Sequence, residues 1–396
     1  MTDDFKRKLQ DYKNGTLTDA EQADLEQQLE KMEIYQAYLD EMLEGEEDNM
    51  TAELGRMTER EAKMHKREAR LLRKGKWRNR VGTALTLVCL YIGVTFVSGI
   101  GTSLYYTTGD PDLGDVNRDV VESAFAVAYP NVTVHLSSNT GAYFNMNVNS
   151  KMTKRVGDEY LEVGDFSGSF LFNWLRLYDF TWSDNEAARS AIFQFPGSSE
   201  LNSDQEWNRL DKLPEGTVTE AYVSYKKLYT TDEFLQKFKG KQLEPVWFAV
   251  DNGDHAEGHD PGGVIWDPIG FPSMPVWHPD DGEILNRETT RKGLFTSSGT
   301  STTRYPAIEQ YGSGQLRNDN FIKTLRILDQ HKSLADRLIH AVDITQSLAY
   351  VEKHGVNIYG AVVTGPTKEV LKLKNDPAVS SIRVGKVTLW NWNHES

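Results

Sequence analysis

The segment DNGDHAEGHDPGG, residues 251–263, brings carboxylates and histidines together in a short stretch. Carboxylates at this density can bind calcium, and two histidines four residues apart can bind zinc. The spacing departs from that of a calcium loop, and the glycines and Pro261 disfavour a helix that would bring both histidines to one face. We interpret the segment as an exposed loop and predict no metal site. Its candidate ligands are Asp251, Asp254, His255, Glu257, His259 and Asp260.

Other residue patterns that carry catalysis are missing from the sequence. It contains no G-x-S-x-G, no H-E-x-x-H and no phosphate-binding glycine loop. The serine in GDFSGSF (164–170) stands between glycines, but its spacing is not that of a nucleophile elbow. We therefore assign no catalytic residue and no cofactor, and predict that the chain is not an enzyme. Six tryptophans can line a groove for sugar or peptide, or belong to the core: Trp182, Trp247, Trp266, Trp277, Trp390 and Trp392.

The longest apolar stretch predicts one transmembrane helix at residues 81–106. These 26 consecutive residues carry no charge, and about 20 apolar residues suffice to cross a bilayer. About 80 hydrophilic residues come first, which is unlike a cleaved signal peptide. Trp77, Tyr105 and Tyr106 flank the run, as expected of aromatic membrane anchors at headgroup level.

Charge on the two sides of this span predicts its orientation. Residues 65–80 are strongly basic, whereas residues 107–115 contain three Asp and no Lys or Arg. The positive-inside rule then places the N-terminus in the cytoplasm and the C-terminal part outside the cell membrane. The single cysteine, Cys89, lies within the span, so no disulfide is expected outside. Small residues Thr95, Gly99 and Ser103 form a row that is compatible with helix association.

Residues 1–76 predict a small all-α head in the cytoplasm. Thr18 and Glu21 have the spacing of a capping box, which marks the start of a long helix. An apolar seam follows along one side of that helix, interrupted by Gln36. The seam consists of Leu25, Leu29, Met32, Leu39 and Leu43.

The composition of this head favours a partner protein. Residues 1–62 hold 7 Lys/Arg against 18 Asp/Glu, and so short a segment with narrow apolar stripes makes a weak core. The seam can pack within the head, against Leu9 and Leu54. Alternatively, it is buried on a partner, and the negative charge suits a basic protein such as one that binds DNA.

The stretch DYKNGTLTDAEQADLEQQLEKMEIYQAYL, residues 11–39, resembles the head of membrane-anchored anti-sigma factors, in which G-x-L-[ST]-x-x-E precedes a long helix. In the zinc-bearing version of that family a His-x3-Cys-x2-Cys motif follows. The matching positions here are Gln28, Met32 and Tyr35, which do not form a zinc ligand set. The resemblance therefore implies a head without zinc.

Residues 153–170, 213–253 and 357–376 are similar to the sigma factor regulator N-terminal and C-terminal domains, which occur together in Gram-positive bacteria. The resemblance implies that the head binds an extracytoplasmic-function sigma factor. We expect the contact at Leu25, Leu29, Met32, Tyr35, Leu39 and Leu43.

The external part reads as two α+β extracytoplasmic domains, at 107–200 and 210–396. The first is β-rich, with strands expected at 131–138, 143–150 and 167–177. The second alternates strands with helices and predicts a sheet with helices on one face, or alternatively a small parallel sheet. Its strands are expected at 220–228, 245–251, 356–365 and 380–392, with a capped helix at 230–240.

These features together predict a multi-domain membrane protein that acts as a single-pass anti-sigma factor. It would hold an extracytoplasmic-function sigma factor at the membrane and release it on an envelope signal. The expected partners are that sigma factor and the lipid bilayer, with a second membrane protein left open and no direct contact with nucleic acid. The alternative is a membrane-anchored extracellular domain that binds or hydrolyses a ligand, with the head as a scaffold.

Overall fold

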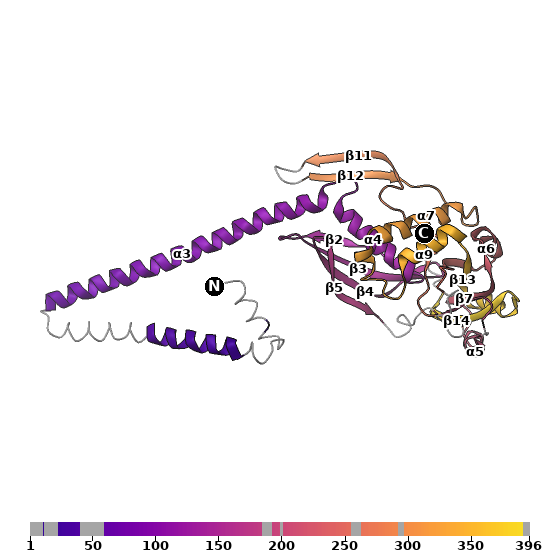
Figure 1. Cartoon of the computed structure of the whole chain (residues 1–396), viewed down its shortest axis with the longest axis horizontal. Helices are drawn as coiled ribbons and strands as arrows, with labels where there is room; N and C mark the ends of the chain where they lie inside the picture. Colours follow the sequence, from indigo (N-terminus) through magenta and orange to yellow (C-terminus); the bar gives the residue numbers. More distant parts are fainter. Residues whose placement is uncertain are drawn as a thin grey trace. The chain divides into compact units, whose positions relative to one another are not determined.

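A computed structural model describes residues 11, 23–39, 59–183, 192–198, 201–254, 263–291 and 297–390. The chain forms two compact units, Met1–Ile92 and Gly93–Ser396, which are described separately (Figure 1). Several predicted residues lie outside the described part. They are Leu9, Thr18, Glu21, Leu43, Leu54, His255, Glu257, His259, Asp260 and Trp392.

The first unit contains a helix at residues 23–39 and the first part of α3 (Glu59–Thr107). The prediction of an all-α head is not supported as a whole, because within residues 1–58 only residues 11 and 23–39 are described, as helix, and the others lie outside the described residues.

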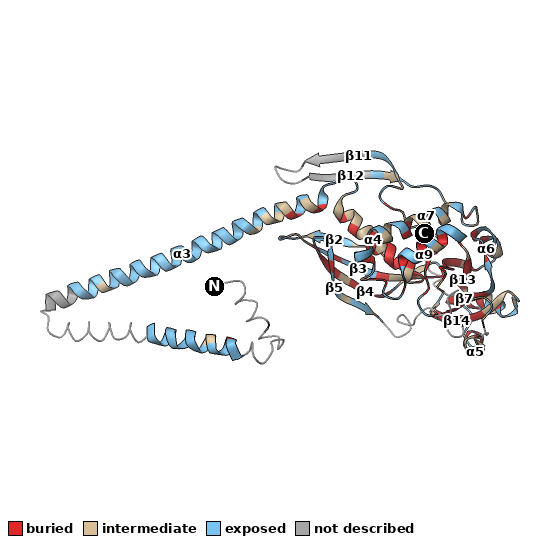
Figure 2. Ribbon diagram, in the orientation of Figure 1, coloured by how far each residue is buried: buried red, intermediate tan, exposed pale blue. Residues whose placement is uncertain are grey.

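Helix α3 runs without interruption through the predicted span and into the second unit. In the described part of the chain it is the one helix long and apolar enough to cross a membrane. Its apolar side chains are exposed over most of its length, as Figure 2 shows. Exposed apolar side chains on a helix of this length are what a lipid environment requires.

After the end of α3, the second unit continues with helix α4 on an antiparallel sheet. Asp112 caps α4 (Leu113–Ala128) by accepting a hydrogen bond from the backbone N–H of Asp115. The sheet has the order β1-β3-β4-β5, and β2 also pairs with β3. Its strands are β1 (Val132–Val134), β2 (Ser137–Thr140), β3 (Asn145–Val156), β4 (Glu159–Leu171) and β5 (Trp174–Trp182).

A second antiparallel sheet follows, in the order β10-β8-β13-β7-β14. The alternative of a parallel sheet is therefore wrong, since every pair in this sheet is antiparallel. Predicted strands coincide with four of the five: β7 (Thr217–Tyr229), β8 (Glu244–Val250), β13 (Ile358–Pro366) and β14 (Val379–Leu389), while β10 (Gly270–Pro272) was missed.

The helices of this half include the predicted capped helix, α6 (Thr231–Phe238), in which Thr230 and Glu233 form a capping box. The other helices are α5 (Asp204–Asp211), α7 (Gln315–Gln330), α8 (Lys332–Ala335), α9 (Ile344–His354), α10 (Thr367–Lys372) and the 3-10 turn Leu373–Asn375. Two further strand pairs are β6 (Phe193–Gln194) with β9 (Val264–Ile265), and the hairpin of β11 (Glu283–Arg291) and β12 (Ser297–Arg304).

One hydrophobic core joins the two sheets. Phe125 of α4 and Phe166 of β4 belong to the same buried cluster as Phe248 and Phe321 of the C-terminal half. The indole N–H of Trp247, which belongs to a second buried cluster, donates to the carbonyl of Ala126, 2.8 Å away. Described residues of the two sheets thus share one core.

Candidate functional site

The helix at residues 23–39 carries the described part of the predicted interface. Leu25 is fully buried and Leu29 is half-buried, whereas Met32, Tyr35 and Leu39 are exposed. The seam is therefore divided: its first turns are covered by protein, and its later turns are open. Only the open part offers apolar surface to another molecule.

Two further exposed apolar residues were missed by the seam pattern, Ile34 and Tyr38. At 100° per residue, Ile34 and Tyr38 lie beside the seam on one side of the helix, and Tyr35 lies between them and the seam. We call Met32, Ile34, Tyr35, Tyr38 and Leu39 the open face of this helix. Ile34 and Tyr38 are identified by their exposure in the structure. The spacing of apolar residues in the sequence does not identify them, because that pattern describes a narrow stripe along a helix.

Position 28, one of those that would carry zinc in the related motif, has an ordinary surface role. The Gln28 amide donates to the Asp24 carboxylate one turn earlier, at 3.0 Å. Among the described residues, no group of three or more His, Cys, Asp or Glu side chains could hold a metal ion. In the loop that begins at Asp251, the Asp251 carboxylate accepts from the hydroxyl of Tyr350, at 3.0 Å.

The three expected membrane anchors have different surroundings. Trp77 is exposed on α3, as an interfacial residue would be. Tyr106 is only 1% exposed, because its ring is covered by the sheet. Its hydroxyl donates to the carbonyls of Phe172 and Phe144, at 2.8 and 3.0 Å. Tyr106 therefore contacts protein, and Tyr105 donates to the side chain of Asn173 at 3.0 Å.

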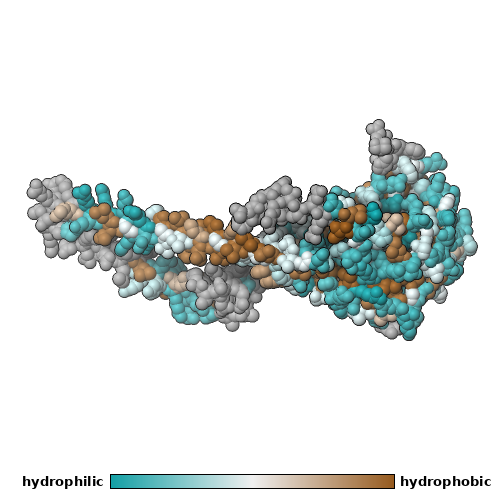
Figure 3. All heavy atoms as spheres, turned by 90° about the horizontal axis from the view of Figure 1, so that it is seen from above, coloured by the Kyte–Doolittle hydropathy of each residue, from teal (hydrophilic) through white to brown (hydrophobic). Residues whose placement is uncertain are grey.

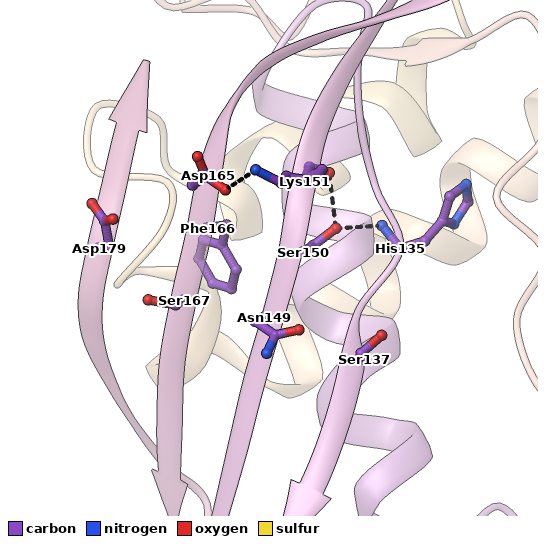
Figure 4. A pocket seen from close by; sticks show the side chains of 9 residues that line it. All are labelled: His135, Ser137, Asn149, Ser150, Lys151, Asp165, Phe166, Ser167 and Asp179. Atoms are coloured by element: carbon purple, nitrogen blue, oxygen red, sulfur yellow. Dashed lines mark hydrogen bonds and ion pairs between the residues drawn. The ribbon is translucent and has the colours of Figure 1, made fainter. Parts of the chain in front are cut away.

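An open, polar pocket of about 490 Å³ lies on the first sheet (Figure 4). Lys151 and Asp165 form an ion pair across it, with 2.7 Å between the nitrogen and the oxygen. The Ser150 hydroxyl accepts from the backbone N–H of His135 and donates to the carbonyl of Lys151. This hydroxyl is thus engaged by the backbone and is not activated by a base.

A buried arrangement of Asp119, His278 and Thr324 has the order of a catalytic triad. Nδ1 of His278 lies 2.8 Å from an Asp119 carboxylate oxygen, and Nε2 lies 2.9 Å from the Thr324 hydroxyl. His278 is fully buried, and Thr324 donates to the carbonyl of Asn320 in its own helix. With no access for a substrate, this set joins α4 to α7 and to the segment that carries His278. No motif in the sequence signalled it, because its members are 159 and 46 residues apart.

The described tryptophans have separate surroundings. Trp247 is a core residue, and Trp277 stacks on Tyr305 with ring centroids 5.6 Å apart. Trp266 is exposed, while Trp390 lines a hollow beside Pro214. The interpretation as core therefore applies to Trp247 and in part to Trp182, which is partly buried against the core.

Comparison with known proteins gives the chain its family. The model described as sigma factor regulator N-terminal matches residues 69–161, and the one described as sigma factor regulator C-terminal matches residues 210–386. Together they match about two thirds of the chain. The chain belongs to the sigma factor regulator family of anti-sigma factors. The alternative of an extracellular binding or hydrolytic protein is not favoured by these matches.

A curated relative of this anti-sigma factor is the probable anti-sigma-M factor YhdL of Bacillus subtilis (strain 168). The two are 28% identical over 399 residues, which cover 99% of this chain and 100% of the relative. No solved structure matches the chain.

A buried ion pair connects the two matched regions of this anti-sigma factor. Lys154 of β3 lies 3.4 Å from Glu220 of β7, and both side chains are almost completely buried. Burial opposes the charge on Lys154, but Glu220 and the hydroxyl of Tyr222 outweigh this and raise the pKa of Lys154. Asn131 and the backbone N–H of Lys386 also donate to Glu220, at 2.8 and 3.0 Å. The pair is thus fully hydrogen-bonded, as a buried pair must be.

Proposed function

We propose that this chain is a single-pass anti-sigma factor whose N-terminal head holds an extracytoplasmic-function sigma factor on the cytoplasmic side. Residues 107–396 would lie outside the membrane, where an envelope signal acts on them and causes release. Family membership supports the general role, and the relative's name suggests a sigma factor of the sigma-M kind.

The observation that carries the proposal is the open face of the helix at residues 23–39. Five apolar side chains, two of them tyrosines, are exposed there on a single short helix. Contiguous exposed apolar surface indicates an interaction site, and tyrosine is enriched among the residues that dominate binding energy. Glu26, Glu30 and Glu33 are exposed on the other side of the same helix, and their negative charge would steer a basic partner toward the head.

The orientation rests on the charges at the two ends of α3. The basic residues 65–80 precede the apolar stretch, and residues 107–115 carry only negative charge. This asymmetry favours a cytoplasmic head. The sigma factor and the head would then share a compartment, as binding requires.

Release needs a large change in binding free energy. A shift from 99:1 bound to 1:99 requires about 5.5 kcal/mol of differential interaction. Proteolysis of the head or of the span would supply this irreversibly, and a second membrane protein that binds residues 107–396 is the other route. In either case the head gives up the sigma factor without any chemistry of its own.

Capture of the sigma factor on the full-length chain tests the proposal. Tagged protein is isolated from membranes of cells that also produce an extracytoplasmic-function sigma factor. We expect the sigma factor to copurify, and Tyr35→Asp or Leu39→Asp to weaken binding by roughly 30-fold, since a dominant interface residue contributes about 2 kcal/mol or more.

Ala37→Asp is the matched control, because Ala37 is exposed on the opposite side of the same helix and the change adds the same charge. It should leave capture unchanged. Absence of the sigma factor with the unaltered chain, or equal capture by all variants, would show that this face is not the contact.

A further inference from the structure

The first sheet ends in two turns rich in aromatic residues, and both lie against the last turns of α3. The β2–β3 turn carries Tyr143 and Phe144, and the β4–β5 turn carries Phe172. Figure 1 shows the turn end of the β2–β3 hairpin beside α3, and the hydrogen bonds between them identify the contact.

All three aromatic residues have a left-handed backbone. Their φ angles are 59° for Tyr143, 57° for Phe144 and 57° for Phe172. This conformation is unusual for bulky side chains and persists only where the surroundings hold it. Three such residues in two adjacent turns indicate a common constraint at this place.

That constraint comes from one face of α3. The Ser98 hydroxyl accepts from the backbone N–H of Tyr143 at 2.7 Å, and the Thr102 hydroxyl accepts from that of Phe144 at 2.8 Å. One turn earlier, the Thr95 hydroxyl is hydrogen-bonded to the Tyr143 hydroxyl, also at 2.7 Å. These side chains recur every three or four residues, so they form one stripe along the helix.

The aromatic rings of the turns and of α3 also pack against one another. Phe144 and Phe172 stack with centroids 4.7 Å apart, and Tyr105 meets the edges of both, at 5.6 and 5.5 Å. Tyr106 is buried beneath the turns and donates to the carbonyl groups of both. The two turns and the end of α3 therefore form a single packed joint.

This joint extends into the predicted span. Thr95 lies ten residues before Tyr105, about 15 Å along the helix. Counted from Val81, a hydrocarbon layer of about 30 Å ends after about 20 residues, near Ile100. The turns that contact Thr95 and Ser98 therefore reach the depth at which the hydrocarbon layer gives way to the headgroups. Figure 3 shows the apolar residues of α3 as a brown band along the helix.

The outward side of the turns has the chemistry of a membrane interface. Tyr143, Leu171, Phe172 and Trp174 remain between 45 and 51% exposed. Tyrosine and tryptophan favour the headgroup layer. The guanidinium of Arg337 lies over the Trp174 ring, 4.6 Å from its centroid, which adds a cation beside the patch.

The backbone of the turns also meets the condition for contact with lipid. Polar backbone groups at membrane depth must be hydrogen-bonded within the protein. Phe172 donates its N–H to the carbonyl of Phe144 at 3.0 Å, and the N–H groups of Tyr143 and Phe144 bond to α3. The carbonyl groups of Phe144 and Phe172 accept from Tyr106.

We propose that the aromatic turns at Tyr143–Phe144 and Phe172–Trp174 insert into the interfacial layer of the bilayer beside α3. Lipid, and not a partner protein, covers their exposed side. The sheet is thereby seated on the membrane through its contact with the last turns of α3. This inference does not depend on which side the head occupies or on its partner, because the turns stay at the C-terminal end of the span in either orientation.

Spin labels on the full-length protein in phosphatidylcholine liposomes test this directly. Cys89 is the only cysteine, so Ala142→Cys combined with Cys89→Ser places one label at the tip of the β2–β3 turn. We expect collisions with oxygen, relative to a water-soluble nickel chelate, to be several-fold more frequent there than for Tyr160→Cys in the same background. Tyr160 is exposed at the other end of the sheet.

The unaltered protein labelled at Cys89 supplies the reference for the interior of the membrane. If the Ala142→Cys protein does not reconstitute, Leu171→Cys takes its place. A tip label as accessible to nickel as the one at position 160 would overturn the proposal. A tip that is open to nickel in liposomes but protected in native membranes would also overturn it, and would identify a protein partner as the cover.

Discussion

The ammonium group of Lys154 lies 3.4 Å from the carboxylate of Glu220 in the protein interior. The two residues come from different sheets, and each belongs to a different one of the two matched family regions. A charge left without its partner at this depth is strongly unfavourable. The pair therefore makes the folding of each sheet depend on the other.

Removal of one member should unfold the protein more easily. We expect Lys154→Met to lower the free energy of unfolding by about 3 to 5 kcal/mol, because Glu220 remains buried and charged. The double variant Lys154→Met with Glu220→Leu should recover part of this loss. Urea denaturation of the full-length protein in detergent, followed by near-ultraviolet circular dichroism, measures both. A double variant no more stable than Lys154→Met would contradict the interpretation.

Glu122 should make stability depend on pH. Burial raises the pKa of the Glu122 carboxyl above its usual range, although the N–H of Leu136 donates to it at 2.8 Å. Since the folded pKa is the higher one, its contribution to stability is full below the unfolded pKa of about 4.3 and is lost as pH rises through the folded pKa.

Glu122→Gln removes the charge and keeps the acceptor. Thermal unfolding at neutral pH should therefore occur at a higher temperature than in the unaltered protein. This advantage should vanish below about pH 4, where both side chains are neutral. An advantage that is the same at both pH values would show that the charge is not responsible.

His278 should prove structural. We expect His278→Leu to reduce the free energy of unfolding by about 2 to 4 kcal/mol, because Asp119 loses its partner and Thr324 loses a hydrogen bond. Asp119→Asn, which can still accept a hydrogen bond from the ring, should cause a smaller loss. Normal stability of the His278→Leu protein in a thermal melt would exclude this role.

Charge on the open face should activate transcription. In cells with a reporter controlled by the cognate sigma factor, Leu39→Asp should raise reporter output while the protein stays in the membrane. Ala37→Asp should leave the output low, and Leu25→Ala should raise it together with loss of the protein, because Leu25 is buried. If reporter output stays low with Leu39→Asp, then Leu39 is not part of the contact with the sigma factor.

Protease treatment of intact cells tests the orientation. If the head is cytoplasmic, residues 1–76 should survive and residues 107–396 should be digested. An epitope tag at each terminus, detected before and after treatment, shows which part remains. Survival of the C-terminal tag alone would reverse the proposed topology.

Prediction from the sequence was most accurate for helices and strands that are determined by local residue patterns. The long apolar helix, the capped helix at 230–240 and most strands of the second sheet were predicted from composition and periodicity. The segment 167–177 was predicted as one strand but contains the end of β4, a turn at Phe172 and the start of β5. Asn173 is the one polar residue of this turn, and the apolar residues Leu171, Phe172 and Trp174 on both sides of it make the segment resemble one continuous strand.

Contacts between residues far apart in the chain could not be predicted from the sequence. Tyr106 looked like a membrane anchor, yet its ring is covered by two turns that follow it by 38 and 66 residues. The Asp119–His278 pair and the Lys154–Glu220 pair likewise join residues far apart in the chain. Spacing rules apply within one element, whereas these contacts are created by the fold.

The common core of the two sheets also bears on how such chains can diversify. If only one half were inherited by a new protein, Glu220 would lose Lys154 and the indole N–H of Trp247 would lose the carbonyl of Ala126. Recombination between relatives should therefore exchange everything after the span as a block, and heads with different specificities can be joined to it upstream. The outer part behaves as one heritable module, although two family regions are recognised within it.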